Sequence, residues 1–198
     1  MSELRFETVQ LNGATMGGLN PHPQFAFTPI NLIRPDKIDP RMEEDDRRLI
    51  GHGFVDGCLP YKLQDEYTRD RCMRPFKVAV LENEILKGFF LLEYGGRLWS
   101  LVHKPTGREL LFRNPVFQPG NLAIRNAWFS GGVEWNFCWP GHTPQTCEPL
   151  FAARTQLDDG TPVLRMYEYE RVRRMPFQMD CFLPNGSPVL YVRVALRN

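Results

Sequence analysis

The residues best suited to chemistry lie in one short stretch, Asn126 to His142, which reads NAWFSGGVEWNFCWPGH. It holds three of the four Trp residues of the chain, a Gly pair, one carboxylate and one imidazole. This set suits a sugar-binding cleft, because flat aromatic faces cover the C–H side of a sugar while a few polar groups bind its hydroxyls. The same composition also suits a buried aromatic core whose glycines serve tight turns.

Glu134 and His142 are the candidate acid–base residues. A carboxylate that follows Val133 and precedes Trp135 is expected to be partly desolvated, which suits general acid or base catalysis. The alternative for Glu134 is a structural ion pair with an arginine such as Arg97. His142 could donate a proton or bind a hydroxyl, and its alternative is an ordinary surface turn.

The Trp residues and one arginine are the candidate ligand contacts. In a strand, Glu134 and Trp135 point to opposite faces, so we expect Trp135 in the core and Trp128 or Trp139 at the cleft. Arg97 follows a second Gly pair. It could bind vicinal hydroxyls, orient Glu134, or form a structural ion pair.

The elements that must position these residues are predicted to be antiparallel strands. From residue 76 onward, runs of β-branched and aromatic residues alternate with turn sequences. Strands separated by short turns, without a long amphipathic helix, predict a mainly β fold, an antiparallel β-sandwich. The expected strands are Phe76–Glu82, Ile85–Glu93, Leu98–His103 and Glu109–Phe112.

The end of the chain predicts a half-buried hairpin. Apolar side chains alternate on one face of each strand, and a turn at 184–188 joins the two strands. The apolar positions are Phe177, Met179, Cys181 and Leu183, then Leu190, Val192, Val194 and Leu196. Because no closing element follows, we expect an incomplete sandwich with an exposed edge. That edge would pair with a second copy or with a missing C-terminal part of the same protein.

Residues 1–75 are predicted to form an extended, loop-rich segment that packs on a sandwich domain at 76–198. Five prolines between positions 21 and 40 exclude long helices there. Extended pieces are expected at Leu4–Leu11 and Phe25–Phe27. The charge run Arg41–Arg48 predicts a solvated face or a short surface helix.

Composition narrows the possible partners and the compartment. The net charge is +1, which gives no electrostatic reason to expect a nucleic-acid or membrane partner. Five Cys at irregular spacing fit free thiols in a reducing compartment, so we expect a cytoplasmic protein. Zinc bound by Cys138, His142 and Cys147 lacks a Cys-x-x-Cys pair, and neither a metal nor a cofactor is expected.

A series of segments resembles a known bacterial family, the domain of unknown function 5107, which has a galactose-mutarotase-like fold. The most specific segment is GGVEWN, at residues 131–136. The likeness covers about residues 77 to 198. The other segments are LENE (81–84), LLEYGGRLWSL (91–101), KPTGRE (104–109), RNPVF (113–117) and GHT (141–143).

The resemblance implies a β-supersandwich that binds a sugar in its concave face. It adds Arg113 and Asn114 as weaker candidates for hydroxyl contacts. It also implies that later strands, which supply a catalytic carboxylate in aldose epimerases, are missing here. The family often precedes tetratricopeptide repeats in larger proteins.

The sequence therefore leaves two alternative functions open. The first is a carbohydrate-active domain, part of a glycoside hydrolase or a sugar epimerase. Hydrolysis needs a second carboxylate, from missing sequence or from Asp65, Glu66 or Asp70. The second is a non-catalytic carbohydrate-binding or scaffolding module of a tetratricopeptide-repeat protein.

Overall fold

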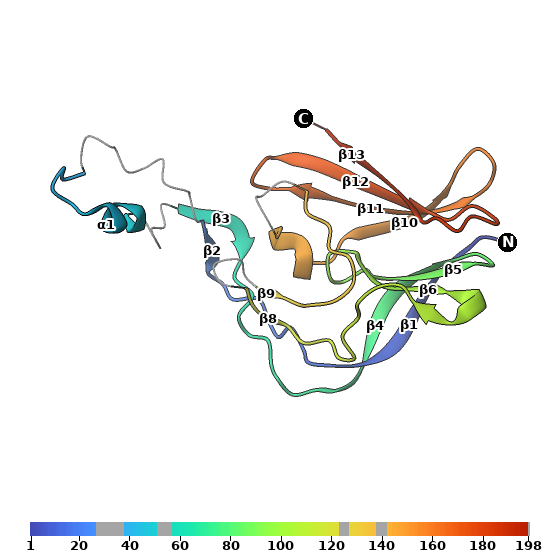
Figure 1. Ribbon diagram of the computed structural model, residues 1–198. Helices are drawn as coiled ribbons and strands as arrows, with labels where there is room; N and C mark the ends of the chain where they lie inside the picture. The colour runs from blue at the N-terminus through green and yellow to red at the C-terminus, as the bar shows by residue number, and fades with distance from the viewer. Residues whose placement is uncertain (27–37, 51–56, 123–126, 138–141, 198) are drawn as a thin grey trace.

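The computed structural model is a mainly β protein in which two antiparallel sheets pack face to face (Figure 1). It describes residues 1–26, 38–50, 57–122, 127–137 and 142–197. The first sheet has the strand order β1-β4-β5-β6-β7, and the second has the order β10-β11-β12-β13. Their bounds are β1 Glu3–Gly13, β4 Cys72–Glu82, β5 Leu86–Leu91, β6 Arg97–His103, β7 Arg108–Glu109, β10 Phe151–Gln156, β11 Pro162–Glu170, β12 Met175–Phe182 and β13 Tyr191–Leu196.

Smaller elements lie around the two sheets. Two short ribbons pair β2 (Pro23–Ala26) with β3 (Gly57–Lys62) and β8 (Gly120–Asn121) with β9 (Ala127–Trp128). Two 3₁₀ turns, η2 (Lys104–Thr106) and η3 (Pro144–Cys147), complete the set with the helix α1 (Glu44–Leu49). The helix buries none of its residues and stands away from the sheets in Figure 1, as the charge run predicted. Within the described residues, no helix is long and apolar enough to span a membrane.

The main core fills the space between the two sheets. Leu81 and Phe90 of the first sheet and Met166 and Met179 of the second are fully buried there. These side chains come from alternate positions along their strands, so one face of each sheet is turned to the other.

A second core covers the opposite face of the first sheet. Phe76, Val78 and Val80 of β4 point into it and meet Phe117 and Phe129 from the long segment that follows β7. From Val78 to Leu81, β4 is therefore buried on both faces, which fits the run of consecutive apolar residues there. The segment that covers this face also carries the candidate site.

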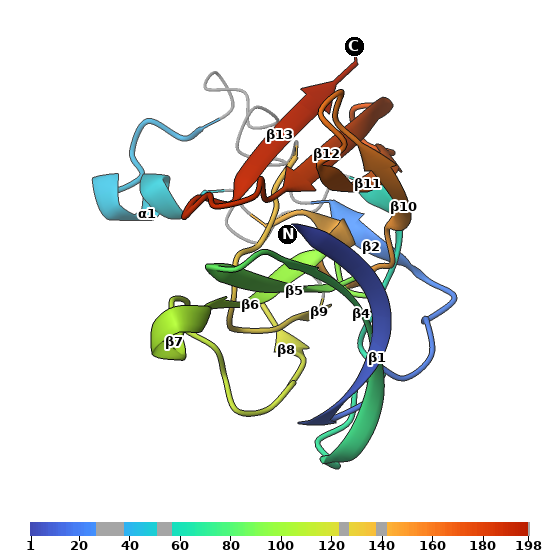
Figure 2. The same cartoon turned by 90° about the vertical axis from the view of Figure 1, so that its right-hand side faces the viewer.

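The structure confirms most of the predicted strands, shortens one, gives another a different place and adds two. Strand β7 ends at Glu109, so the expected strand through Phe112 is mostly irregular. The strands β10 and β11 were not predicted from the sequence. Strand β1 pairs with β4 over its whole length, so it belongs to the sandwich itself rather than to a segment packed on it (Figure 2).

The terminal hairpin is buried on only one of its two strands. Residues 177, 179, 181 and 183 are buried as predicted, whereas every residue of β13 is exposed. The reason is its place: β13 is the outer strand of the second sheet, and its apolar face lies beyond the core described above. The prediction of an exposed edge is thus correct, and that of a half-buried second strand is wrong.

The four cysteines within the described residues fall into two classes of expected reactivity. Cys58 and Cys72 are exposed free thiols, whereas Cys147 and Cys181 are buried. Burial raises the pKa of Cys147 and of Cys181 to about 12. Because the thiolate is the reactive form, the two buried thiols should stay unreacted near pH 8.

We therefore expect iodoacetamide to alkylate Cys58 and Cys72 in the native chain much faster than Cys147 and Cys181. Peptide mass spectrometry at increasing times measures the four rates separately. Addition of denaturant is the control and should make all four thiols react at similar rates. Fast native alkylation of Cys147 would contradict its buried position.

Candidate functional site

The site is built around Arg97, the first residue of β6. It follows Gly95 and Gly96, which both adopt positive φ values (65° and 61°). A Cβ on Gly95 would lie 2.9 Å from the backbone of Thr146, so only glycine lets this turn approach η3 so closely. The turn thereby directs the Arg97 side chain into the protein, where it is only 2% exposed.

Arg97 organises the backbone and one carboxylate around it. Its Nη1 donates to the carbonyl oxygens of Phe129 (2.9 Å) and Gly131 (3.0 Å), and its Nη2 donates to Thr146 Oγ1 (2.7 Å). The guanidinium also lies over the Phe129 ring, 4.0 Å from its centroid. Burial lowers the pKa of Arg97, and the nearby Glu134 carboxylate opposes that effect.

Glu134 is held by three side chains at once. Oε2 accepts a hydrogen bond from Trp128 Nε1 at 2.7 Å and lies 3.6 Å from Arg97 Nη2. His142 Nδ1 lies 2.8 Å from both carboxylate oxygens. The Glu134 side chain is 12% exposed, whereas that of His142 is 39% exposed. The carboxylate is therefore enclosed and the imidazole faces outward.

This arrangement assigns the proton on His142. A carboxylate that accepts from an indole N–H and lies beside a guanidinium acts as an ionised acceptor. His142 Nδ1–H is then the donor of the pair, and in a neutral ring of this tautomer Nε2 is the acceptor. The geometry is that of an imidazole oriented by an enclosed carboxylate, which can take up or deliver a proton at Nε2.

The loop that carries Glu134 is fixed by backbone contacts. Val133 N donates to Leu98 O (2.9 Å), and Gly132 N donates to Phe112 O (2.8 Å). Asn136 Oδ1 accepts from Thr143 N at 2.7 Å, which ties the residues just after Glu134 to the residue just after His142. Glu134 and His142 are thus positioned from both sides.

The other predicted site residues are placed in different ways. Trp128 lies at the site, and its ring centroid is 5.4 Å from that of His142. Trp135 packs against the main core and donates to Gly96 O (2.9 Å), as alternation predicted. Asn114 donates to Ser130 O (3.2 Å), close to the carbonyls bound by Arg97.

Two predicted residues do not join this group. Arg113 is exposed and borders a small hollow with Val9, Leu11 and Trp99. Trp139 lies outside the described residues, as does Cys138 of the zinc alternative.

The N–H groups of Arg97 donate to acceptors of the protein itself. The position of Arg97 therefore favours a role in orienting Glu134 over a role in binding a ligand. In the described part of the chain, no group of three His, Cys, Asp or Glu side chains could hold a metal ion.

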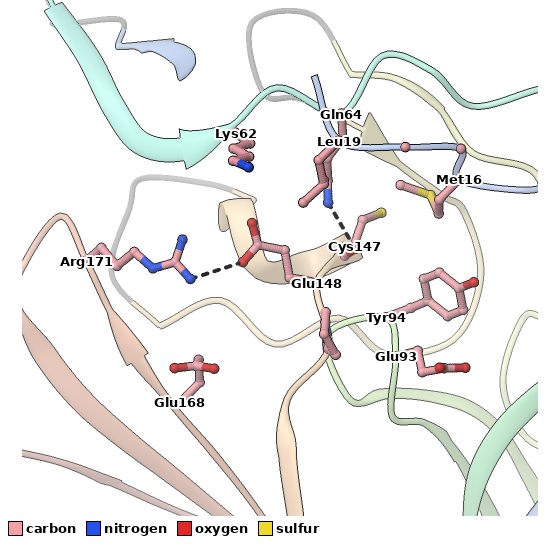
Figure 3. A pocket seen from close by; sticks show the side chains of 13 residues that line it. Met16, Leu19, Lys62, Gln64, Glu93, Tyr94, Cys147, Glu148, Glu168 and Arg171 are labelled. Atoms are coloured by element: carbon pink, nitrogen blue, oxygen red, sulfur yellow. Dashed lines mark hydrogen bonds and ion pairs between the residues drawn. The ribbon is translucent and has the colours of Figure 1, made fainter. Parts of the chain in front are cut away.

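A pocket that no sequence pattern indicates lies beside η3. It has a volume of about 560 Å³ and is bordered by Met16, Leu19, Lys62, Tyr94, Glu148, Glu168 and Arg171, among others (Figure 3). These residues come from segments far apart in the chain. No local pattern marks them, although Glu148 follows η3 directly and could have been considered with His142.

Comparison with known proteins identifies the family. The model of the domain of unknown function DUF5107 matches residues 54–198, which include both the first sheet from β4 onward and the whole second sheet. The chain belongs to the DUF5107 family. The GGVEWN segment and the Glu134–His142 pair both lie within the matched part of this DUF5107 chain.

A solved structure shares the fold of this DUF5107 chain. It is a TPR-domain containing protein from Parabacteroides distasonis, 20% identical, with a TM-score of 0.71. The match covers 98% of this chain and 29% of that protein's chain, so the present chain spans under a third of its length. At this identity the match shows the fold alone.

Proposed function

We propose that this domain binds a carbohydrate at the group formed by Glu134, His142 and Trp128. The observation that carries the proposal is the Glu134–His142 pair, in which His142 Nδ1 lies 2.8 Å from both oxygens of an enclosed carboxylate. Trp128 adds an aromatic face that is fixed by its own hydrogen bond to Glu134. An aromatic face beside a few oriented polar groups is a common way to bind a sugar.

The resemblance to galactose-mutarotase-like proteins supports the same proposal. In that fold a sugar lies in the concave face of a β-supersandwich, and the present DUF5107 domain would use its site in this way. If the domain is an enzyme, His142 Nε2 is the atom that moves the proton and Glu134 orients the ring. Anomeric epimerisation and glycoside hydrolysis both need such a group.

A second function, a non-catalytic carbohydrate-binding or scaffolding module, is favoured by two separate observations. The similar solved structure is that of a TPR-domain containing protein, in which this fold makes up only part of the chain. The exposed strand β13 also offers an apolar edge for contact with another part of the same protein or with a second copy.

Substitution of the pair separates the two functions. In the full-length protein, His142→Ala should lower turnover of the sugar substrate by about 10²- to 10⁴-fold if the domain is an enzyme, while sugar affinity changes little. Glu134→Gln should also lower turnover, because the imidazole loses its orienting acceptor. A binding module should instead show no turnover in the wild type and weaker binding in both variants.

Isothermal titration calorimetry with glucose, galactose, xylose, maltose and lactose, together with polarimetry of fresh α-glucose and α-galactose solutions, measures both quantities. Asp158→Asn is the matched control, because Asp158 lies on an exposed turn of the second sheet. The absence of saturable binding by every sugar would refute the proposed function.

A further inference from the structure

The pocket of Figure 3 lies outside the Glu134–His142 group and has its own set of charged side chains. Arg97 and Thr146 separate the two: Arg97 contacts Glu134, and Thr146 precedes Cys147 and Glu148, which border the pocket. A volume of about 560 Å³ is in the range of pockets that take small organic ligands. The pocket is thus large enough to hold a ligand of its own.

The walls of the pocket are held in place by short contacts. Gln64 Nε2 donates to Cys147 O at 3.1 Å, which attaches the segment after β3 to η3. A Cβ on Gly17 would lie 2.1 Å from Glu66 O, so the segment at Gly17 packs directly on that backbone. Asn20 N donates to Leu63 O at 3.0 Å and closes the same wall. The shape of the pocket is therefore fixed by contacts within the protein.

Glu148 is the best-placed polar group in this pocket. Its side chain is 16% exposed, and Oε2 lies 4.0 Å from Arg171 Nη2, which is too long for a hydrogen bond. Figure 3 shows the Arg171 guanidinium reaching toward this carboxylate. Burial raises the pKa of Glu148, while Arg171 opposes the rise and Glu168 adds to it. A ligand hydroxyl placed here would bond to the carboxylate and relieve part of its desolvation.

The charges around the pocket select the class of ligand. Three carboxylates (Glu93, Glu148 and Glu168) and two basic groups (Lys62 and Arg171) border it together. An anionic ligand would meet the carboxylates, and a cationic one would meet the two basic groups. A hydroxyl donates to a carboxylate and accepts from a guanidinium. A neutral ligand rich in hydroxyls can therefore form hydrogen bonds with both the acidic and the basic side chains. The side chains of Met16, Leu19 and Tyr94 supply apolar surface for its C–H groups.

We propose that this pocket is a separate binding site for a neutral mono- or disaccharide, with Glu148 and Arg171 as its hydroxyl-binding residues. The site does not depend on the Glu134–His142 group, because the two sets share no side chain. It would give the domain a second saccharide site.

Nuclear magnetic resonance of the ¹⁵N-labelled 198-residue chain tests the two sites independently. The amide signals of Gly17 and Gly18 report on the pocket, and the indole N–H of Trp128 reports on the Glu134 group. Glucose, galactose, maltose and lactose are the probes, with glucose 6-phosphate and glucosamine as charged counterparts. We expect saturable shifts of the glycine amides with a neutral sugar and at least tenfold weaker binding of both charged probes.

Glu148→Ala should weaken binding at the glycine amides by about tenfold or more and leave the Trp128 response unchanged. Arg171→Ala, in which a half-exposed side chain is removed, should do the same and serves if Glu148→Ala does not fold. Asp158→Asn is the control and Glu134→Gln should affect only the Trp128 signal. Unshifted glycine amides with every neutral sugar, or unchanged binding by both pocket variants, would overturn the site without bearing on the Glu134 group.

Discussion

Arg97→Met should lower the free energy of unfolding by about 3–5 kcal/mol, which is a large part of the stability of a domain of this size. The substitution leaves the Glu134 carboxylate without its guanidinium neighbour and removes the donor from two backbone carbonyls and from Thr146. Buried acceptors that lose their donors cost more than the hydrogen bonds themselves contributed. Equilibrium urea unfolding followed by tryptophan fluorescence measures the change.

Arg97→Lys should rescue only a small part of this loss. An ammonium group can pair with Glu134, but it cannot reach the carbonyls of Phe129 and Gly131 and the hydroxyl of Thr146 together in the fixed geometry of a guanidinium. Arg113→Met is the matched control, since Arg113 is exposed and should change stability by no more than about 0.5 kcal/mol. Equal effects of Arg97→Met and Arg113→Met would show that Arg97 does not organise the site.

Gly132→Ala should be the most damaging single-methyl substitution in the candidate site. Gly132 has a φ of 69°, and an added Cβ would lie 2.3 Å from Leu98 O and 3.0 Å from Trp99 Cα. Both neighbours are backbone atoms of β6, so the loop must move away and break the hydrogen bonds at Gly132 and Val133. We expect a loss of more than about 3 kcal/mol, from strain together with lost hydrogen bonds.

Gly107→Ala separates the clash from the effect of φ. Gly107 has nearly the same φ, 66°, but nothing lies within 4 Å of its added Cβ. It should therefore cost only about 1 kcal/mol, the usual penalty of a left-handed alanine. Thermal unfolding of the two variants compares them directly, and the ¹⁵N spectrum of Gly132→Ala should show a displaced Trp128 indole signal. Similar stabilities for the two variants would mean that the loop at Gly132 can move away from β6 without a loss of stability.

The sequence was sufficient for most of the strands and for part of the site. Alternation along β12 identified its buried face, because each residue of a strand points to the side opposite its neighbours. The expected placement of Trp135 against the core and Glu134 away from it is also confirmed, although residues 134–137 form no strand. The Gly pair before Arg97 indicated a tight turn. β10 and β11 were not recognised, although β11 carries the buried residues Val163, Leu164 and Met166.

Only the tertiary structure decided which residues pack against each of these strand faces and turns. Nothing in the sequence around β13 distinguishes a covered apolar face from an exposed one, because that depends on how far the opposite sheet extends. Arg97 meets Glu134 and Thr146 only because the Gly95–Gly96 turn packs on η3. Likewise, Glu148 and Arg171 share a pocket with the N-terminal segment near Leu19 through the packing of distant parts of the chain. Periodicity reports the direction of a side chain from its own strand, whereas its partners are set by long-range packing.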